Sequence, residues 1–310
     1  IQGSLPMFMV LAQMAVLIAC GALWQALAPR HIPALAHRRA LTDLVFYILL
    51  PAMVIDVIWQ APLDITSMKI SLLAMSGLAT AALSIWLVLK VIPVTNAQKG
   101  ALILAATFPN VTYLGLPVLD QVLGSWSNAI ILQYDLFACT PILMTVGMLM
   151  AGYYGSHDQS SHPLKSLIKI PPLWAVTIAV LLNLLNVERP DFIHSALQTL
   201  SGGVVPLMLI ALGMSIRWQS LRLNLLPLLL PVAAITLFMA PAGVWLVTQV
   251  LNLPTDIMTT VILSAAMPTM VFGIVICERY GLDTSLYAAA VTLTTVLCMA
   301  SLPVWFYWIN

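Results

Sequence analysis

The sequence predicts an all-helical integral membrane protein with ten transmembrane helices. Its composition, the spacing of its apolar stretches and the placement of its Lys and Arg residues lead to this prediction. Hydrophobic residues make up 61% of the 310 residues, charged residues make up 7%, and the mean hydropathy is +1.01. Because soluble domains carry about 25% charged residues, this composition excludes a cytosolic enzyme, a nucleic-acid-binding protein and a disordered scaffold.

Apolar stretches of about 20 residues, the length that crosses a bilayer as a helix, divide the chain into ten predicted spans. The first is too long for a signal-peptide core and has no small-residue cleavage site after it, so we expect a retained helix. The sixth is short, and the seventh opens with Ser201-Gly202-Gly203, a weak helix start. The predicted spans cover 5–27, 41–60, 69–90, 99–121, 128–152, 170–186, 199–216, 224–250, 256–278 and 285–308.

The Lys and Arg residues alternate between the two sides of the membrane. Of these 12 residues, all but Lys69 and Arg189 fall in loops that follow an odd-numbered span. The positive-inside rule therefore places these loops in the cytoplasm and both termini outside. For a bacterial inner membrane, which we expect here, the outside is the periplasm. A missed helix would disturb the alternation, so the charge pattern also supports the count of ten.

The most polar segment, 153–169, divides the chain into two sets of five spans. We expect it to be a cytoplasmic linker between a first repeat at 1–152 and a second repeat at 170–310. Because five is an odd number, two similar halves would have opposite orientations in the membrane. Inverted repeats of this kind are common in secondary transporters.

Two pairs of prolines at matching positions support the repeat. Pro109 and Pro268 lie near the middle of the fourth and ninth spans, and Pro51 and Pro206 lie in the second and seventh. A single proline would indicate a simple kink, whereas a matched pair favours two broken helices that line a binding site. The half-helices after Pro109 and Pro268 would direct unpaired N–H groups at one small volume, which favours an anion. The half-helices before the two prolines end at the same volume, and their C-termini could instead hold a cation or a proton donor.

Three segments carry a resemblance to a known family. They are 41–51 (LTDLVFYILLP), 107–117 (TFPNVTYLGLP), and 265–268 (AAMP) followed by 278–283 (ERYGLD). They resemble the second helix, the fourth helix, and the ninth helix with its following loop in the auxin efflux carrier family. That family includes the plant PIN auxin exporters and bacterial carriers of malonate, malate and similar acids. The resemblance covers nearly the whole chain.

The resemblance implies an inverted five-plus-five repeat with two crossing, broken helices, similar to the bile-acid/sodium symporter fold. It also implies a scaffold domain of helices 1, 2, 6 and 7 and a transport domain of helices 3–5 and 8–10, with substrate bound between them. In plant members, an asparagine directly after the fourth-helix proline contacts the substrate carboxylate, and Asn110 matches that position. Gln133 resembles a fifth-helix glutamine near the site.

The predicted substrate site surrounds the two prolines. Asn110 can both donate and accept hydrogen bonds, and its alternative role is to satisfy carbonyls that Pro109 frees. Thr112 and Thr269 could offer hydroxyls to substrate or cap the local backbone, and Met270 lies beside the second break. The residues that we predict to bind substrate are Pro109, Asn110, Val111, Thr112, Gln133, Pro268, Thr269 and Met270.

Two acids are candidate proton carriers. An ionisable residue inside a membrane span usually faces a cavity or a partner. Asp135, in the fifth span, could accept a proton during transport or be a structural acid bonded to a neighbouring helix. Asp56 lies near the outer end of the second span, where solvation at the membrane interface is the simpler explanation.

We expect no enzyme activity, no cofactor, no metal site and no nucleic-acid partner. The four cysteines lie in apolar runs without a CxxC pair, and the five histidines fall in loops. The sequence has no GxSxG, HExxH or nucleotide-binding loop, so a membrane-embedded hydrolase would lack its chemistry.

The predicted function is secondary transport, by efflux or exchange, of small organic anions such as mono- or dicarboxylates or auxin-like acids. We expect an elevator-type movement of one domain. An anion channel or a membrane ligand sensor on the same fold is the alternative, although a channel needs a continuous polar lining and the polar positions here cluster at one depth. The expected partners are the substrate and the bilayer, with a homodimer as a further candidate assembly.

Overall fold

The computed structural model describes residues 7–27, 34–155, 171–215 and 223–309. Their regular structure is helical, apart from one isolated antiparallel bridge between Pro109 and Thr269. Six of the described helices are long and apolar enough to cross a membrane, which confirms the predicted all-helical membrane-spanning class. These six are Ala36–Ile58, Ile65–Val91, Ser127–Tyr154, Asp191–Gly213, Leu226–Leu251 and Thr284–Ile309. Shorter apolar helices cover Ala12–Leu27, Val111–Leu123, Pro171–Leu184 and Thr255–Ala265.

The elements of the first half follow the first five predicted spans in order. They are α1 (Met7–Leu27), α2 (Ala34–Leu44), η1 (Val45–Leu49), α3 (Leu50–Ile58), α4 (Ile65–Val91), α5 (Asn96–Thr107), η2 (Val111–Gly115), α6 (Leu116–Leu123), α7 (Ser127–Tyr134), η3 (Asp135–Cys139), α8 (Thr140–Ile142), η4 (Leu143–Gly147) and α9 (Met148–Tyr154). The predicted linker 153–169 lies almost wholly outside the described residues.

The second half is also helical. Its elements are α11 (Pro171–Leu184), α12 (Asp191–Ser201), α13 (Val204–Gly213), η6 (Leu223–Leu225), α14 (Leu226–Ala234), η7 (Ile235–Met239), α15 (Ala240–Leu251), α16 (Thr255–Ala265), α17 (Gly273–Tyr280) and α18 (Thr284–Ile309). Here η6 is a 3₁₀ turn, whereas η1, η2, η3, η4 and η7 are π-helical turns.

Two helices begin seven or more residues earlier than the sequence predicts. The second begins at Ala34 rather than at 41, and the seventh begins at Asp191 rather than at 199. The pair Gly202 and Gly203 is not a helix start, because both residues keep right-handed helical backbone angles (φ −60° and −78°) and join α12 to α13. The extended backbone of Pro190, at the N-cap, sets the true start of α12.

Most of the π-helical turns end two residues before a proline. Proline lacks an N–H and its ring clashes with the carbonyl of the preceding turn in a regular α-helix, so a wider turn accommodates it without breaking the helix. The prolines concerned are Pro51 after η1, Pro117 after η2, Pro141 after η3 and Pro241 after η7. This local adjustment keeps several proline-containing spans continuous.

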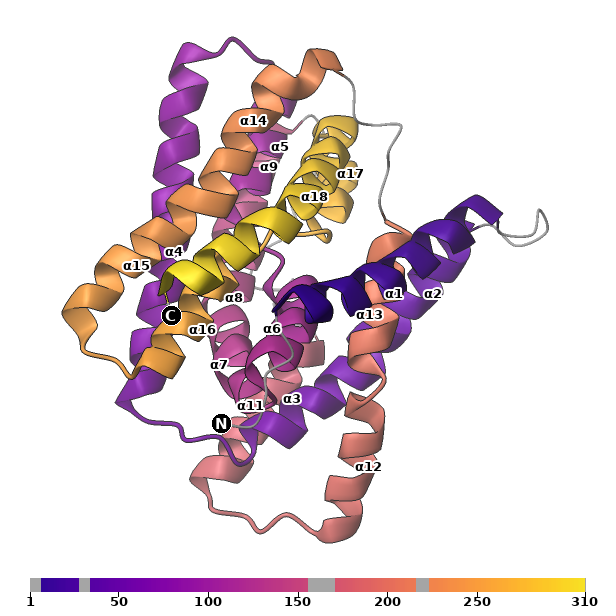
Figure 1. Cartoon of the computed structure of the whole chain (residues 1–310), viewed down its shortest axis with the longest axis vertical. Coiled ribbons are helices and arrows are strands. Elements are labelled where there is room, and N and C mark those ends of the chain that lie inside the picture. The colour runs from indigo at the N-terminus through magenta and orange to yellow at the C-terminus, as the bar shows by residue number, and fades with distance from the viewer. Residues whose placement is uncertain (1–6, 28–33, 156–170, 216–222, 310) are drawn as a thin grey trace.

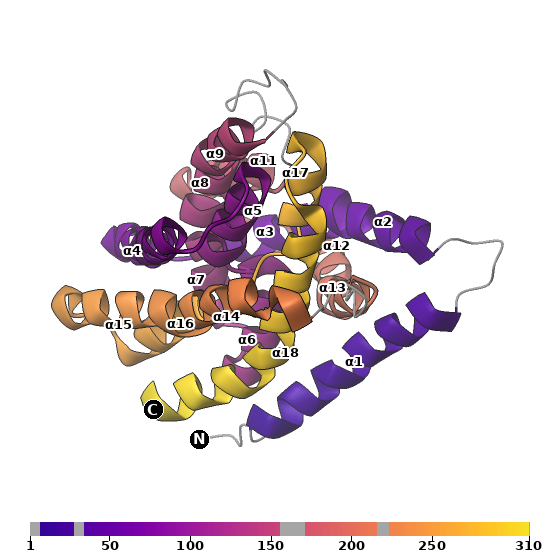
Figure 2. The ribbon, with the colours of Figure 1, turned by 90° about the horizontal axis from the view of Figure 1, so that it is seen from above.

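The helices pack in two groups. In one group, α1 packs on α13, and α3 packs on α11 and α12. In the other, α4 packs on α5 and α15, α16 packs on α7 and α15, and α18 packs on α5 and α14. Figures 1 and 2 show α1, α2 and α13 on one side of the molecule and α4 and α15 on the other, with α6 and α7 between them.

Glycines allow a close approach between α1 and α13. A Cβ atom on Gly213 would collide with the carbonyl oxygen of Ile18, and a Cβ atom on Gly21 would collide with the carbonyl oxygen of Ile210. Membrane helices use small residues at such contacts because their backbones then gain van der Waals packing. The two glycines therefore fix α1 against α13.

We expect Gly213→Ala to lower the free energy of unfolding by about 1–3 kcal/mol, since the added methyl group forces the two helices apart. The matched control is Gly202→Ala, where the added Cβ would make ordinary contacts at 3.6 and 3.7 Å. Thermal unfolding of both variants in detergent measures the difference. Equal melting temperatures for the two variants would contradict the close contact.

Candidate functional site

Both helices that carry a central proline are interrupted there, as the sequence predicts. In the first half α5 ends at Thr107 and the chain becomes helical again at Val111; in the second half α16 ends at Ala265 and α17 begins at Gly273. The two interruptions lie side by side and pair as antiparallel backbone. The N–H of Asn110 donates to the carbonyl of Pro268 (2.7 Å), and the N–H of Met270 donates to the carbonyl of Phe108 (3.0 Å).

Side chains satisfy further backbone groups around the interruptions. The Thr269 hydroxyl donates to the carbonyl of Ala105 (2.8 Å), and the Thr236 hydroxyl donates to the carbonyl of Ala106 (3.2 Å). The Tyr287 hydroxyl donates to the carbonyl of Met270 (2.7 Å), and the N–H of Thr269 donates to the Thr294 hydroxyl (3.1 Å). The Thr269 hydroxyl therefore bonds the opposite broken helix rather than its local backbone.

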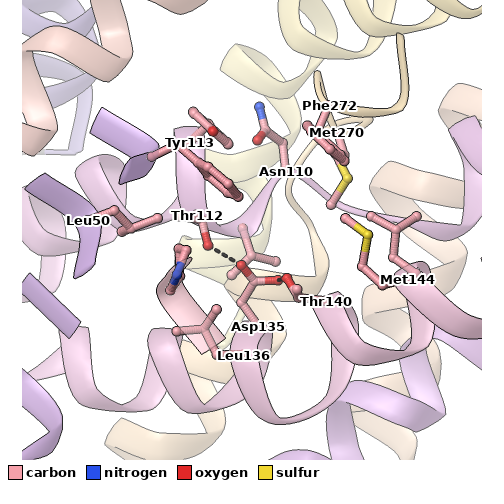
Figure 3. A pocket seen from close by; sticks show the side chains of 14 residues that line it. Leu50, Asn110, Thr112, Tyr113, Asp135, Leu136, Thr140, Met144, Met270 and Phe272 are labelled. Carbon is pink, nitrogen blue, oxygen red and sulfur yellow. Dashed lines mark hydrogen bonds between the residues drawn. The ribbon is translucent and has the colours of Figure 1, made fainter. Parts of the chain in front are cut away.

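A cavity lies beside the paired interruptions, and Figure 3 shows its lining side chains. Its empty volume is about 510 Å³, including the space at its mouth. Residues of both helix groups line it: Phe46, Leu50 and Pro172 on one side, and Asn110, Val111, Thr112, Tyr113, Asp135, Leu136, Thr140, Leu143, Met144, Met270 and Phe272 on the other. Phe46 and Phe272 stack nearly parallel across the two groups, with ring centroids 6.4 Å apart. The cavity is therefore mainly apolar with a few polar groups.

Asn110 is the N-cap residue of η2, and its side chain is 1% exposed. Among the described residues, its amide nitrogen has no hydrogen-bond partner, and the side chain makes no cap bond to the following helix. Buried side-chain donors are nearly always paired, so an unpaired one indicates a missing partner. The amide nitrogen also does not donate to a carbonyl freed by Pro109, which was its alternative role.

Asp135 is the first residue of η3, and it is 4% exposed. Its carboxylate accepts hydrogen bonds from the hydroxyls of Thr112 and Thr140, the latter at 3.2 Å. The Thr112 hydroxyl therefore donates to a carboxylate on another helix rather than to its own backbone. Because Thr112 follows Asn110 by two residues, this bond connects the first interruption to the fifth span.

The structure brings half of the predicted substrate residues to the cavity. Asn110, Val111, Thr112 and Met270 line it, whereas Pro109, Pro268 and Thr269 form the backbone bridge and do not line it. Gln133 is buried on α7, its amide oxygen has no hydrogen-bond partner among the described residues, and it does not line the cavity either. Substrate binding by these residues stays a prediction.

The second candidate proton carrier lies elsewhere. Asp56, on α3, accepts from Arg189 Nη1 at 2.6 Å, and its carboxylate lies 3.0 Å from His194 Nδ1. Arg189 also donates to the backbone carbonyl of Asp56 and to Gln60. None of these residues lines the cavity. Asp56 therefore has a partner that fits a structural role, and proton transfer by either acid stays a prediction.

Several lining residues were not predicted from the sequence. Phe46 and Leu50 lie within the segment 41–51 that carries the family resemblance, but apolar residues in an apolar span show no distinguishing signal. Thr140 lies one wide helical turn after Asp135, a spacing that places both on one face of a π-helical turn. Phe272 lies close to Pro268, in the irregular segment after α16, whose path the sequence pattern does not define.

A helical membrane-spanning protein with two paired helix interruptions beside a buried, partly polar cavity has the architecture of a membrane transporter. The chain belongs to the membrane transport protein family, whose model matches residues 6–306. This confirms the family that the sequence resemblance indicated, that of the auxin efflux carriers.

Curated relatives agree with this assignment. An uncharacterized transporter of Methanothermobacter thermautotrophicus is 28% identical over 210 residues, which is 68% of each chain. An uncharacterized transporter of Methanocaldococcus jannaschii is 25% identical over 217 residues, again 68% of each chain. The uncharacterized transporter YfdV of Escherichia coli is 22% identical over 221 residues, 69% of each chain. The chain is therefore similar to transporters over about two thirds of its length.

We expect Thr269→Val to lower the free energy of unfolding by about 1–3 kcal/mol, because it leaves the buried carbonyl of Ala105 without its donor. Thr269→Ser keeps the hydroxyl and is the matched control. Chemical or thermal unfolding in detergent measures both. A Val variant as stable as the Ser variant would show that the hydroxyl does not support the interruption.

Proposed function

We propose that the protein is a secondary transporter of small organic anions and that the substrate carboxylate binds at the paired helix interruptions. The amide nitrogen of Asn110 is the observation that carries this proposal. This nitrogen is a buried donor without a partner among the described residues, and Asn110 is one of the residues that line the cavity. A carboxylate is a strong acceptor for such a donor, because hydrogen bonds to charged groups are shorter and stronger than neutral ones.

The start of the helix after Asn110 supports a negative ligand. The helix Val111–Leu123 begins at the cavity, where the first N–H groups of a helix lack partners in their own helix. These N–H groups carry the positive end of the helix dipole. An anion near Asn110 is therefore stabilised both by hydrogen bonds to the N–H groups and by the dipole. The apolar walls, with Phe46, Phe272 and Met144 among them, suit the carbon skeleton of a small acid.

We further propose the inverted five-plus-five repeat, with its fourth and ninth spans crossing at the interruptions. One interrupted helix from each half and the antiparallel pairing of the two interruptions support it. The cavity borders both helix groups, so a movement of one group against the other would carry a bound substrate along. This is the elevator-type mechanism, with helices 1, 2, 6 and 7 as the scaffold. The Lys and Arg distribution supports a bacterial inner-membrane orientation with both termini in the periplasm.

We expect Asn110→Ala to weaken binding of the transported carboxylate about ten- to hundredfold, since a hydrogen bond to a charged group contributes about 1.5–3 kcal/mol. A thermal-shift screen of organic acids first identifies a ligand, because a compound that binds the folded state raises the melting temperature. Uptake of the labelled ligand into proteoliposomes then measures the affinity.

The control variant for this measurement is Asn128→Ala. Asn128 is also a buried asparagine, but its amide donates to Asp120 at 2.7 Å and it does not line the cavity. Unchanged affinity in Asn110→Ala, or an equal loss in both variants, would contradict the proposed site.

A channel and a carrier differ in the electrical current that they give in a planar bilayer. We expect no unitary currents when the purified protein is reconstituted in planar bilayers, and saturable exchange of labelled carboxylate in proteoliposomes. Discrete single-channel currents carried by an organic anion would contradict the carrier mechanism. A ligand sensor would bind the acid without moving it across the membrane.

A further inference from the structure

We propose that the transported acid carries an ammonium or a hydroxyl group in addition to its carboxylate. Asp135 accepts a hydrogen bond from this group. The inference rests on the proposed carboxylate site at Asn110 and names the class of acid that fits the rest of the cavity.

Asp135 has acceptor capacity that its described neighbours do not use. An ionised carboxylate offers about four lone-pair positions. Two neutral hydroxyls, those of Thr112 and Thr140, are its hydrogen-bond donors among the described residues. Asp135 is one of the residues that line the cavity, so a donor on a ligand bound there lies close to it.

The described elements around Asp135 provide no cation to pair with it. No described Lys, Arg or His lies within 4.0 Å of its carboxylate. The titratable groups that interact with it electrostatically are Tyr113, Tyr134 and Cys139, which are uncharged in their ordinary forms.

Of the helices that pack on η3, α4 has lysines, but both are occupied elsewhere. Lys69 donates to the carbonyl of Leu251 at 3.1 Å, and Lys90 lies over the ring of Trp86, 3.5 Å from its centroid. The sequences of α8 and α11 contain no basic residue. Ionising a buried carboxyl group that has no partner costs several kcal/mol, so a donor or cation from the ligand would stabilise the ionised form.

The cavity therefore has two polar ends: Asn110 offers a hydrogen-bond donor at one end, and Asp135 offers a hydrogen-bond acceptor at the other. Figure 3 shows Asn110 at one end of the lining side chains and Asp135 at the other, with Met144 and Met270 at their side. A monocarboxylate with an amino or hydroxyl group can satisfy both ends. A simple monocarboxylate leaves Asp135 unpaired, and a dicarboxylate brings a second negative charge to it, which is unfavourable at short range.

Two matched series of acids test the inference in proteoliposomes. The small series is alanine, lactate, propionate and malonate, and the larger series is phenylalanine, phenyllactate, phenylpropionate and benzylmalonate. Competition against the best labelled acid, at one fixed pH, gives the relative affinities. In the series that fits the cavity, we expect the amino or hydroxy acid to bind at least tenfold more tightly than the unsubstituted acid, and the dicarboxylate to bind most weakly.

Two substitutions separate the ammonium from the hydroxyl donor. Asp135→Asn keeps an acceptor oxygen but removes the charge, so it should abolish a preference for the amino acid and largely keep one for the hydroxy acid. Asp135→Leu removes both preferences. In each variant the preference is measured as the ratio of the affinity for the substituted acid to the affinity for the unsubstituted acid, so an equal loss for both acids does not count as a lost preference. Asp256→Asn, at an exposed acid on α16, is the control.

Three results would overturn the inference. The wild-type protein could bind the unsubstituted acid as tightly as its substituted relatives, or it could bind the dicarboxylate best; neither result depends on the folding of a variant. The third is proton coupling: a pH gradient would drive uptake of the unsubstituted acid in the wild-type protein but not in Asp135→Asn. If no acid of either series binds, the carboxylate site itself is wrong, and the inference falls with it.

Discussion

Two backbone hydrogen bonds, from Asn110 to Pro268 and from Met270 to Phe108, hold the region on which the rest of the structure depends. In apolar surroundings an unpaired backbone group costs several kcal/mol, so an interrupted helix needs a partner inside the protein. Each interruption is the partner of the other, and Thr236, Thr269 and Tyr287 satisfy nearby carbonyls. This pairing places Asn110 and Met270 in the lining of the same cavity, although they are far apart in sequence.

The chemistry of the cavity follows from the few polar groups that this arrangement leaves beside it. Asn110 occupies the N-cap position of the helix that starts at Val111, so in the proposed site its unpaired amide and the first helical N–H groups would stabilise an anion together. Thr112, one residue further along that helix, bonds Asp135, which gives the cavity a second and opposite end. The remaining walls are apolar and come from both helix groups.

The hydrophobic stretches and the prolines predicted the membrane-spanning class and the interruptions at Pro109 and Pro268, since both depend on local chemistry. They also led to Asn110 and Asp135, because polar residues in apolar spans are conspicuous. The roles of neighbours could not be predicted, because they depend on tertiary contacts: Thr269 caps a carbonyl of the opposite helix, while Phe46 and Thr140 reach the cavity. The helical angles at Gly202 and Gly203 likewise depend on packing rather than on propensity.

An anomalous-diffraction experiment with a brominated acid tests the central claim most directly. Crystals of the protein soaked with 3-bromopropionate or 4-bromophenylacetate should show a bromine peak inside the cavity bordered by Phe46 and Met144, with the carboxylate within hydrogen-bonding distance of the Asn110 amide nitrogen. The same soak of Asn110→Ala should lose the peak. A bromine peak elsewhere in the protein, or an acid bound in the cavity with its carboxylate turned away from Asn110, would contradict the account.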